Sequence, residues 1–157
     1  MKEIPLTQGK VAIVDDEDYE YLNQWKWCVT DTGYAIRQAS RPSKKGIRMH
    51  RVIMQTPDGM DTDHINGNKL DNRRCNLRIC TRSQNLQNSL AHSNNTSGRK
   101  GVSWSTLHQK WVAQIKTNTG YHYLGLFSDI ADAVKTYDVA ARKYFMEFAR
   151  PNFQEEK

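Results

Sequence analysis

Residues 61–88 run DTDHINGNKLDNRRCNLRICTRSQNLQN, a stretch that is dense in Asp, Asn and Arg and has few apolar anchors. Such a segment cannot bury much surface, so something other than a hydrophobic core must fix it, and a metal ion is one candidate. Within it Asp63 and His64 are adjacent, Asn76 lies twelve residues beyond His64, and Asn85 lies nine residues beyond Asn76. One imidazole and several oxygen donors therefore fall within a short segment.

These residue types match what the hydrolysis of a phosphodiester requires. The attacking water must lose a proton, and a histidine with a pKa near neutrality can accept it. A divalent cation can neutralise the charge that develops on the phosphate and can hold the leaving oxygen. Because Asp and Asn supply hard oxygen ligands, we expect a divalent ion, Mg²⁺ in the first place and Mn²⁺ as the alternative.

The run from Asp63 to Asn85, DHINGNKLDNRRCNLRICTRSQN, resembles the motif of the HNH endonucleases, especially the subgroup of phage and intron homing enzymes. The resemblance also takes in the His50-Arg51 pair upstream and extends over residues 1–90. It implies a metal-dependent endonuclease that acts on DNA. Its site would be a ββα-metal fold, two strands and a helix around one ion, with its core at residues 50–90.

Position by position, the resemblance assigns four roles. Asp63 corresponds to the first metal ligand, and His64 to the general base that activates water. Asn76 corresponds to the central Asn of the motif, which holds the loop and helps to orient the histidine. Asn85 corresponds to the ligand on the helix, which is His in other members.

The residues by themselves leave alternatives open for these roles. Asp63 could cap a turn, and Asn76 beside Leu could be a structural turn residue. Asn88, one helical turn beyond Asn85, and His92 are rivals for the helix ligand.

Upstream of the motif, His50 is more typical of a structural histidine than of a catalytic one. Arginines are the candidate phosphate contacts: Arg51, Arg73, Arg74, Arg78 and Arg82.

The distribution of charge favours a polyanionic partner. The chain carries 23 Lys and Arg against 17 Asp and Glu, and its isoelectric point is near 9.3. Residues 37–51 hold six basic residues and no acid, and residues 99–116 hold four basic residues and no acid. Nucleic acid complements such patches, and double-stranded DNA is the expected partner. RNA, or a basic surface that serves only solubility, is the alternative.

Composition disfavours several other classes of protein. No apolar run approaches the roughly 20 residues that span a bilayer, and residues 1–5 lack a signal-peptide stretch, so we expect a cytoplasmic protein without a membrane partner. Cys28, Cys75 and Cys80 include no CxxC pair, which disfavours structural zinc and disulfides. No heptad pattern suggests an obligate protein partner. The likeness to phage enzymes makes a bacterial host the natural setting.

The N-terminal third predicts short strands and a helix. Residues 10–14, 25–30 and 34–37 read as strands, and the acidic segment after the first of them predicts the start of a short helix. Residues 41–46 predict a basic loop. Residues 49–54 predict a short helix or a strand.

The C-terminal third predicts a separate domain at residues 98–153, joined by a polar, turn-rich linker at residues 91–97. A turn at Asn118-Thr119-Gly120 joins the last two of three strands. These strands are predicted at residues 101–105, 110–116 and 121–127. Apolar residues at helical spacing from Ile130 to Tyr144 predict one amphipathic helix, with Ser128 as its N-cap.

This domain resembles the APETALA2/ERF-type DNA-binding domain. The likeness rests on Gly101-Val102, residues 111–116, Leu124-Gly125, Tyr137-Asp138 and Asn152-Phe153. That family lays a three-stranded sheet in the major groove of DNA, with its helix behind the sheet.

Strand alternation and the resemblance together predict which side chains of this domain face DNA. The expected contacts are Lys100, Gln114, Lys116, Tyr121 and Tyr123. The first strand of the family carries several outward arginines, whereas this chain has Lys100, Ser103 and Ser105 at those positions. We therefore expect weaker readout of bases.

The sequence as a whole predicts an α+β protein with a small β-rich N-terminal region, a ββα-metal nuclease motif, and a three-stranded antiparallel sheet packed on one helix. The predicted function is a metal-dependent DNA endonuclease with His64 and Asn76 as catalytic residues and one divalent ion on Asp63 and Asn85. The alternative is a non-catalytic DNA-binding regulator of transcription.

Overall fold

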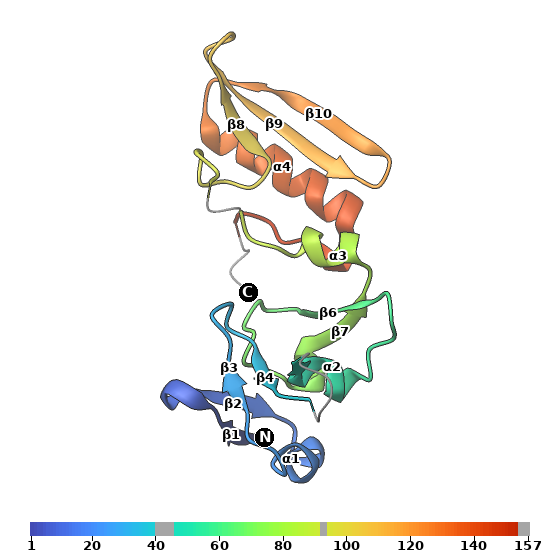
Figure 1. Cartoon of the computed structure of the whole chain (residues 1–157). Coiled ribbons are helices and arrows are strands. Elements are labelled where there is room, and N and C mark those ends of the chain that lie inside the picture. The colour runs from blue at the N-terminus through green and yellow to red at the C-terminus, as the bar shows by residue number, and fades with distance from the viewer. Residues whose placement is uncertain (40–45, 92–93, 154–157) are drawn as a thin grey trace. The chain divides into compact units, whose positions relative to one another are not determined.

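The computed structural model describes residues 1–39, 46–91 and 94–153, so most of the predicted basic loop 41–46, and His92, lie outside the described residues. Two compact units make up the chain, Met1–Asn85 and Leu86–Lys157 (Figure 1). The segment that was predicted as a linker, residues 91–97, falls within the second unit. In the described part of the chain, no helix is both long and apolar enough to cross a membrane.

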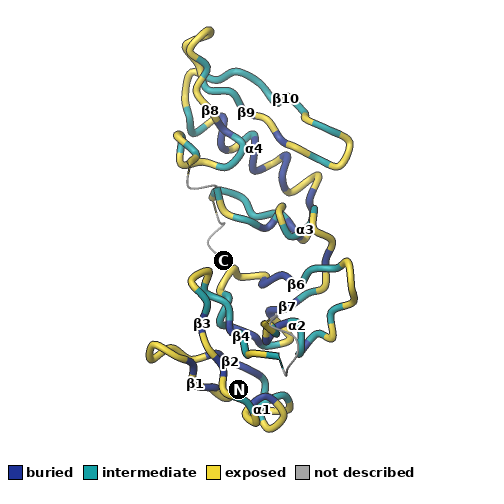
Figure 2. The backbone as a smooth tube through the Cα atoms, in the orientation of Figure 1, coloured by how far each residue is buried: buried dark blue, intermediate teal, exposed yellow. Residues whose placement is uncertain are grey.

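A β-hairpin and a helix carry the N-terminal core; the sequence predicts the second strand of the hairpin and the helix, but not the first strand. β1 (Lys2–Pro5) pairs antiparallel with β2 (Val11–Val14), and α1 (Asp16–Leu22) lies against β1. Successive strand side chains point to opposite faces, so alternate residues of the hairpin turn inward. The buried ones are Ile4, Ala12 and Val14 (Figure 2).

A second small sheet follows, made of β3 (Cys28–Val29), β4 (Ala35–Arg37) and β5 (Ile47–Arg48), all antiparallel. The strand predicted at residues 25–30 is wrong for its first half. The Trp27 indole donates to the backbone oxygen of Leu22 at 2.8 Å, and its ring is buried in the core. This contact ties the start of the segment to the end of α1, so pairing begins only at Cys28.

The motif region begins with α2 (Met49–Met54), which settles the choice between helix and strand there. β6 (Asp61–His64) then pairs antiparallel with β7 (Leu77–Cys80), and α3 (Arg82–Gln87) follows. The mixture of small sheets and helices agrees with the predicted α+β class.

The loop between β6 and β7 is hydrogen-bonded to strand β2 of the N-terminal hairpin. Ile13 donates its backbone N–H to the oxygen of Leu70 at 2.8 Å and accepts from the N–H of Asn72 at 2.8 Å. Two backbone bonds to one residue of β2 fix the middle of this polar loop, which has little apolar surface of its own. The hairpin thus positions the residues that follow His64.

In the second unit three strands carry one helix, as predicted. β8 (Val102–Ser105), β9 (Lys110–Thr117) and β10 (Gly120–Phe127) form an antiparallel sheet with β9 in the centre, and α4 (Ile130–Phe145) packs on it (Figure 1). Apolar side chains fill the space between sheet and helix: Val102, Ala113, Ile115, Val134 and Tyr137.

The predicted N-cap of α4 is corrected by one residue. Asp129, not Ser128, is the cap, because its Oδ1 accepts the backbone N–H of Ala131 at 2.7 Å. A carboxylate at this position also faces the positive end of the helix dipole, which a serine hydroxyl would match less strongly.

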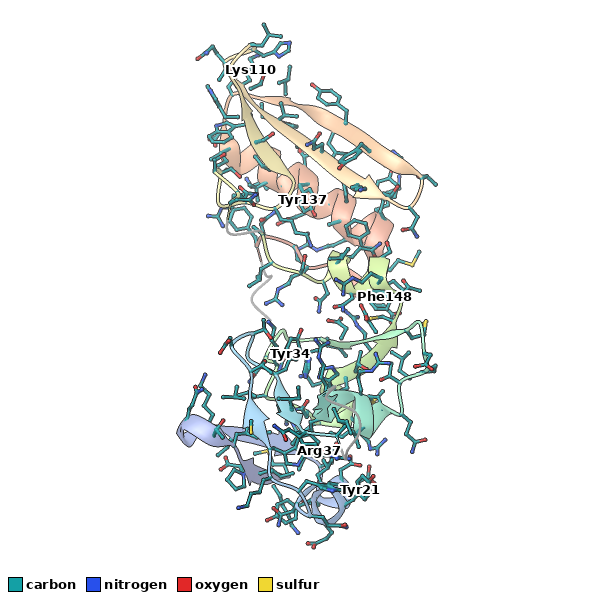
Figure 3. All side chains as sticks on the ribbon, viewed as in Figure 1. Tyr21, Tyr34, Arg37, Lys110, Tyr137 and Phe148 are labelled. Carbon is teal, nitrogen blue, oxygen red and sulfur yellow. The ribbon has the colours of Figure 1, made fainter. Side chains whose placement is uncertain are left out.

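A buried carboxylate on α4 holds the C-terminal residues 152 and 153 of the second unit. Asp138 on α4 accepts three hydrogen bonds, from the backbone N–H and the Nδ2 of Asn152 and from the N–H of Phe153, at 2.8 to 3.0 Å. Asn152 in turn bonds both backbone groups of Lys100. Gly101 beside it has φ +74°, and a Cβ there would lie 2.0 Å from the ring of Tyr137, the residue labelled in Figure 3, so only glycine fits.

Candidate active site

His64 ends β6 and is held by an amide eight residues further along the chain. Its Nε2 lies 3.2 Å from Oδ1 of Asn72, and both side chains are buried. Because an amide oxygen can only accept, Nε2 carries the proton and Nδ1 carries the lone pair. Burial is the main cause that lowers the pKa of His64, against the opposing effect of the bond to Asn72. The imidazole is therefore neutral near pH 7, the state that a general base requires.

Asn76 organises the loop that follows His64. Its Oδ1 accepts the backbone N–H of Asn66 at 3.0 Å, and its Nδ2 donates to the backbone oxygen of Asp71 at 2.7 Å. The backbone oxygen of Asn76 also accepts from Ile65. The motif assigns both the loop and the orientation of the histidine to Asn76, whereas in the structure Asn72 bonds the imidazole.

Asn72 is a residue that the sequence analysis missed. It has no exposed surface, and it lies in a turn that contains four amides within a few residues. Nothing in residue type or spacing distinguishes the one amide that turns toward the imidazole, because that depends on how the loop docks on β2.

Asp63 faces an arginine on the neighbouring strand. Arg78 lies directly opposite it in the β6–β7 register, and Nε and Nη2 of Arg78 donate to Asp63 Oδ2 at 2.9 and 2.8 Å. The predicted first metal ligand thus forms an ion pair with the predicted phosphate contact Arg78.

Asn85 lies on α3, and its side chain contacts Asp61 of β6. Its Nδ2 donates to Asp61 Oδ2 at 3.0 Å, and Arg82 donates to the same oxygen at 3.2 Å. The bond from Asn85 is the main cause that lowers the pKa of Asp61. Asp61 was also missed, although its position two residues before Asp63 on one strand is a usable signal, because strand residues i and i+2 share a face.

Three aromatic rings meet next to these groups. The rings of His50 and His64 are 5.0 Å apart between centroids and nearly perpendicular, and Tyr34, which Figure 3 labels, lies 5.2 Å from His50 and 6.0 Å from His64. Tyr34 comes from the β3–β4 connection, so the site draws on an element well upstream of the motif.

Known proteins include relatives of this chain. A family model described as HNH endonuclease matches residues 48–87. The chain is 27% identical over 151 residues to the uncharacterized HNH endonuclease L560 of Acanthamoeba polyphaga mimivirus, covering 92% of this chain and 76% of that protein. It is 33% identical over 120 residues to protein 3.8 of Escherichia phage T7, covering 73% of this chain and 98% of that protein. The chain belongs to the HNH endonuclease family.

No solved structure matches this HNH endonuclease. The family acts on DNA and generally uses a divalent metal ion. The matched residues run from β5 to α3 and include Asp61, His64 and Asn85. The likeness of the second unit to APETALA2/ERF-type domains lies outside the match and rests on the sequence pattern.

Most predicted phosphate contacts of the HNH endonuclease are engaged within the protein. Arg73 makes a two-pronged pair with Asp71 at 2.7 Å, and Arg74 pairs with Asp18 at 2.6 Å. Arg51 donates to the backbone oxygens of residues 56, 57 and 60, which secures the loop before β6. These contacts favour structural roles for the three arginines.

The predicted contacts of the second unit divide into two groups. Lys100 is half-buried, and its Nζ donates to the backbone oxygens of Gln87 and Ser89. Burial lowers the pKa of Lys100 to about 8. The other four side chains are exposed and share one face of the sheet, because Lys116 pairs with Tyr121 and Gln114 pairs with Tyr123.

The two alternatives to Asn85 as the helix ligand are Asn88 and His92. Asn88 is buried within the second unit, and His92 lies outside the described residues. Among the described residues, no three His, Cys, Asp or Glu side chains are grouped to hold a metal ion.

Proposed function

We propose that this HNH endonuclease hydrolyses phosphodiester bonds in double-stranded DNA with a divalent metal ion, Mg²⁺ in the first place, and with His64 as the general base. The observation that supports this most directly is the hydrogen bond from His64 Nε2 to Asn72 Oδ1. It selects the tautomer in which the lone pair lies on Nδ1, the atom that takes the proton from water.

Asn72 also suits the imidazole after it has taken up a proton. Nε2 donates the same bond in the neutral and the charged ring, so protonation at Nδ1 breaks no contact with Asn72. Asp63 and Asp71 are close enough to raise the pKa of His64, which favours the imidazolium. Burial acts in the other direction and keeps the resting ring neutral.

Asp63 and Asn85 are the proposed metal ligands, with Asp61 as a further oxygen donor. Carboxylate and amide oxygens fit a hard divalent cation. The bond from Asn85 Nδ2 to Asp61 leaves the amide oxygen as the atom of Asn85 that would bind the ion. Asp63 would exchange its pair with Arg78 for the ion, and the guanidinium would then suit a phosphate oxygen. When bound, the ion neutralises charge on the phosphate and holds the leaving oxygen.

For the second unit we propose that the outward sheet face binds DNA, as the APETALA2/ERF likeness implies. Tyr121 and Tyr123 are 70% and 65% exposed there, and Lys116 lies 5.3 Å from the ring of Tyr121. A lysine can hold a phosphate, and a glutamine such as Gln114 can read adenine. Ser103 is the outward residue of β8 where the family has arginine, so few side chains are available for base readout.

The test of the proposed function is plasmid nicking by the purified chain in a series of divalent ions and in EDTA. We expect cleavage with Mg²⁺, none in EDTA, and a loss of about 100-fold or more in His64→Ala with DNA binding retained. His108→Ala, which changes an exposed histidine in the β8–β9 turn, is the matched control. Undiminished cleavage by His64→Ala would rule out the proposed base, and cleavage in EDTA would rule out the metal.

A further inference from the structure

Four cations and a single carboxylate line a pocket of about 310 Å³ in the first unit. The pocket lies between the β3–β4 connection, α2 and β6, and its charged residues are Arg48, Arg51, Asp61, Lys69 and Arg82. The excess of positive charge in a concave site attracts an anion.

His50 contributes to the wall of this pocket and is nearly fully buried, with 2% of its surface exposed. Its Nδ1 is buried and has no hydrogen-bond partner in the part of the chain that the structure describes. A buried polar group without a partner is costly and calls for a reason. Ring contacts with Tyr34 and His64 hold the imidazole where it stands.

The charges around His50 favour an anionic ligand. Burial, followed by the nearby His64, Arg48 and Arg51, lowers the pKa of His50 to about 3. The neutral ring keeps one N–H to donate, which suits an oxygen of an anion.

Two of the cations are suited to an external anion. Arg48 is exposed and has no acidic partner among the described residues, and Lys69 contacts only the backbone oxygen of Thr32, at 2.8 Å, among its hydrogen bonds there. Both lie over the ring of Tyr34, at 5.1 and 4.7 Å from its centroid. This distinguishes them from Arg73 and Arg74, which acids of the first unit neutralise.

We propose that the pocket binds a backbone phosphate of DNA, with His50 donating a ring N–H to a phosphate oxygen and Arg48 and Lys69 supplying the charge. This rests on the proposed function, since it puts that phosphate beside the general base. The 5.0 Å between the rings of His50 and His64 makes one phosphate accessible to both.

The experiment measures binding of a short DNA duplex by fluorescence anisotropy in EDTA, where hydrolysis does not interfere. His50→Leu removes both ring nitrogens but no hydrogen bond within the described protein, so we expect an unchanged melting temperature and an affinity about 10-fold weaker. His50→Gln keeps an N–H donor and is expected to restore most of that affinity. A purely structural histidine would give the reverse, a lower melting temperature with unchanged affinity of the folded fraction.

The cations are tested in the same assay. Lys69→Ala and Arg48→Ala should each weaken binding and lower the salt dependence of the affinity by about one released ion. Lys26→Ala, an exposed lysine of the first unit outside the pocket, is the control. If Lys69→Ala and Arg48→Ala both behave like Lys26→Ala, the pocket is not a phosphate site.

A measurement on the unaltered chain keeps the proposal testable if the His50 variants fail to fold. In long-range ¹H–¹⁵N spectra of the histidine rings, the duplex should shift the His50 signals, and inorganic phosphate should do so only at much higher concentration. Unmoved His50 signals with bound duplex would overturn the proposal. Because binding in EDTA needs no hydrolysis, cleavage by His64→Ala would refute the general base and leave the phosphate pocket standing.

Discussion

The two units differ in how much polar surface they bury. Beside its apolar core, the first unit buries seven polar or charged side chains in residues 50–76, and all but His50 make hydrogen bonds within the described part of the unit: His50, Thr62, Asp63, His64, Asp71, Asn72 and Asn76. In the second unit the core is the apolar layer between sheet and helix, and the buried polar side chains among its described residues are Asn88 and Asp138. A polar framework positions reactive groups precisely but depends on every hydrogen bond, whereas an apolar layer tolerates local change.

The largest effect is expected at Asp138, a buried carboxylate in the otherwise mainly apolar core of the second unit. Asp138→Ala leaves three N–H groups of residues 152 and 153 without their acceptor, so we expect a loss of about 3 kcal/mol in the free energy of unfolding of that unit. Hydrogen exchange resolved by segment measures it. Asp132→Ala, an exposed acid in the first turn of α4, should cost about 0.5 kcal/mol at most. Equal losses in the two variants would show that the hydrogen bonds of Asp138 to residues 152 and 153 do not stabilise the second unit.

A smaller effect should follow from opening the polar loop of the first unit. Asn76→Ala removes the acceptor for Asn66 and the donor to Asp71, and we expect a loss of about 2 kcal/mol confined to the first unit. Cleavage should fall at the same time, because the loop also carries Asn72. Asn68→Ala, an exposed amide of the same loop, serves as the control. Protection factors that fall equally in both units would contradict the division drawn here.

The smallest effect is expected from acid, which should separate the units by their histidines. The pKa of His50 is about 3 in the fold and near 6.5 in an unfolded chain, so the unfolded state binds more protons between these values. Stability of the first unit should fall by about 1 kcal/mol between pH 6.5 and pH 5.5 and stay level above pH 6.5. His64 adds in the same direction, since its pKa is also lowered.

Urea unfolding followed by hydrogen exchange at pH 7.5 and 5.5 checks this expectation. His50→Gln should flatten the slope, because its side chain does not titrate. A first unit that is as stable at the lower pH as at the higher would mean that His50 is not held neutral.

Strand alternation and helical spacing predicted the second unit well. Three strands, the turn at residues 118–120 and α4 all follow from local pattern, and the error at the N-cap is a single residue. Local pattern suffices there because each element buries one continuous apolar face. Lys100 is different: its chain position suggested an outward side chain, while its ammonium in fact bonds two carbonyls of the segment before β8.

The first unit could be predicted only in part. The motif predicted two strands and a helix within residues 50–90, where the structure has β6, β7 and α3, and the HNH endonuclease family model matches residues 48–87. Trp27 was placed in a strand, although its indole caps a carbonyl at the end of α1. The prediction fails at residues 25–27 because the hydrogen bond from the Trp27 indole to Leu22 outweighs the weak strand preference of these three residues.

Sequence alone determined which chemical groups this protein has to offer, because residue identity decides which groups can take a proton, donate oxygen ligands or carry charge: His64 next to Asp63, with Asn76 and Asn85 downstream. Tertiary structure decided which of those groups meet. It turned Asn72 toward the imidazole, set Asn85 beside Asp61, and brought Tyr34, His50 and Lys69 to one pocket. Such contacts join residues distant in the chain and depend on how β2, α2 and the loop pack, which no local pattern encodes.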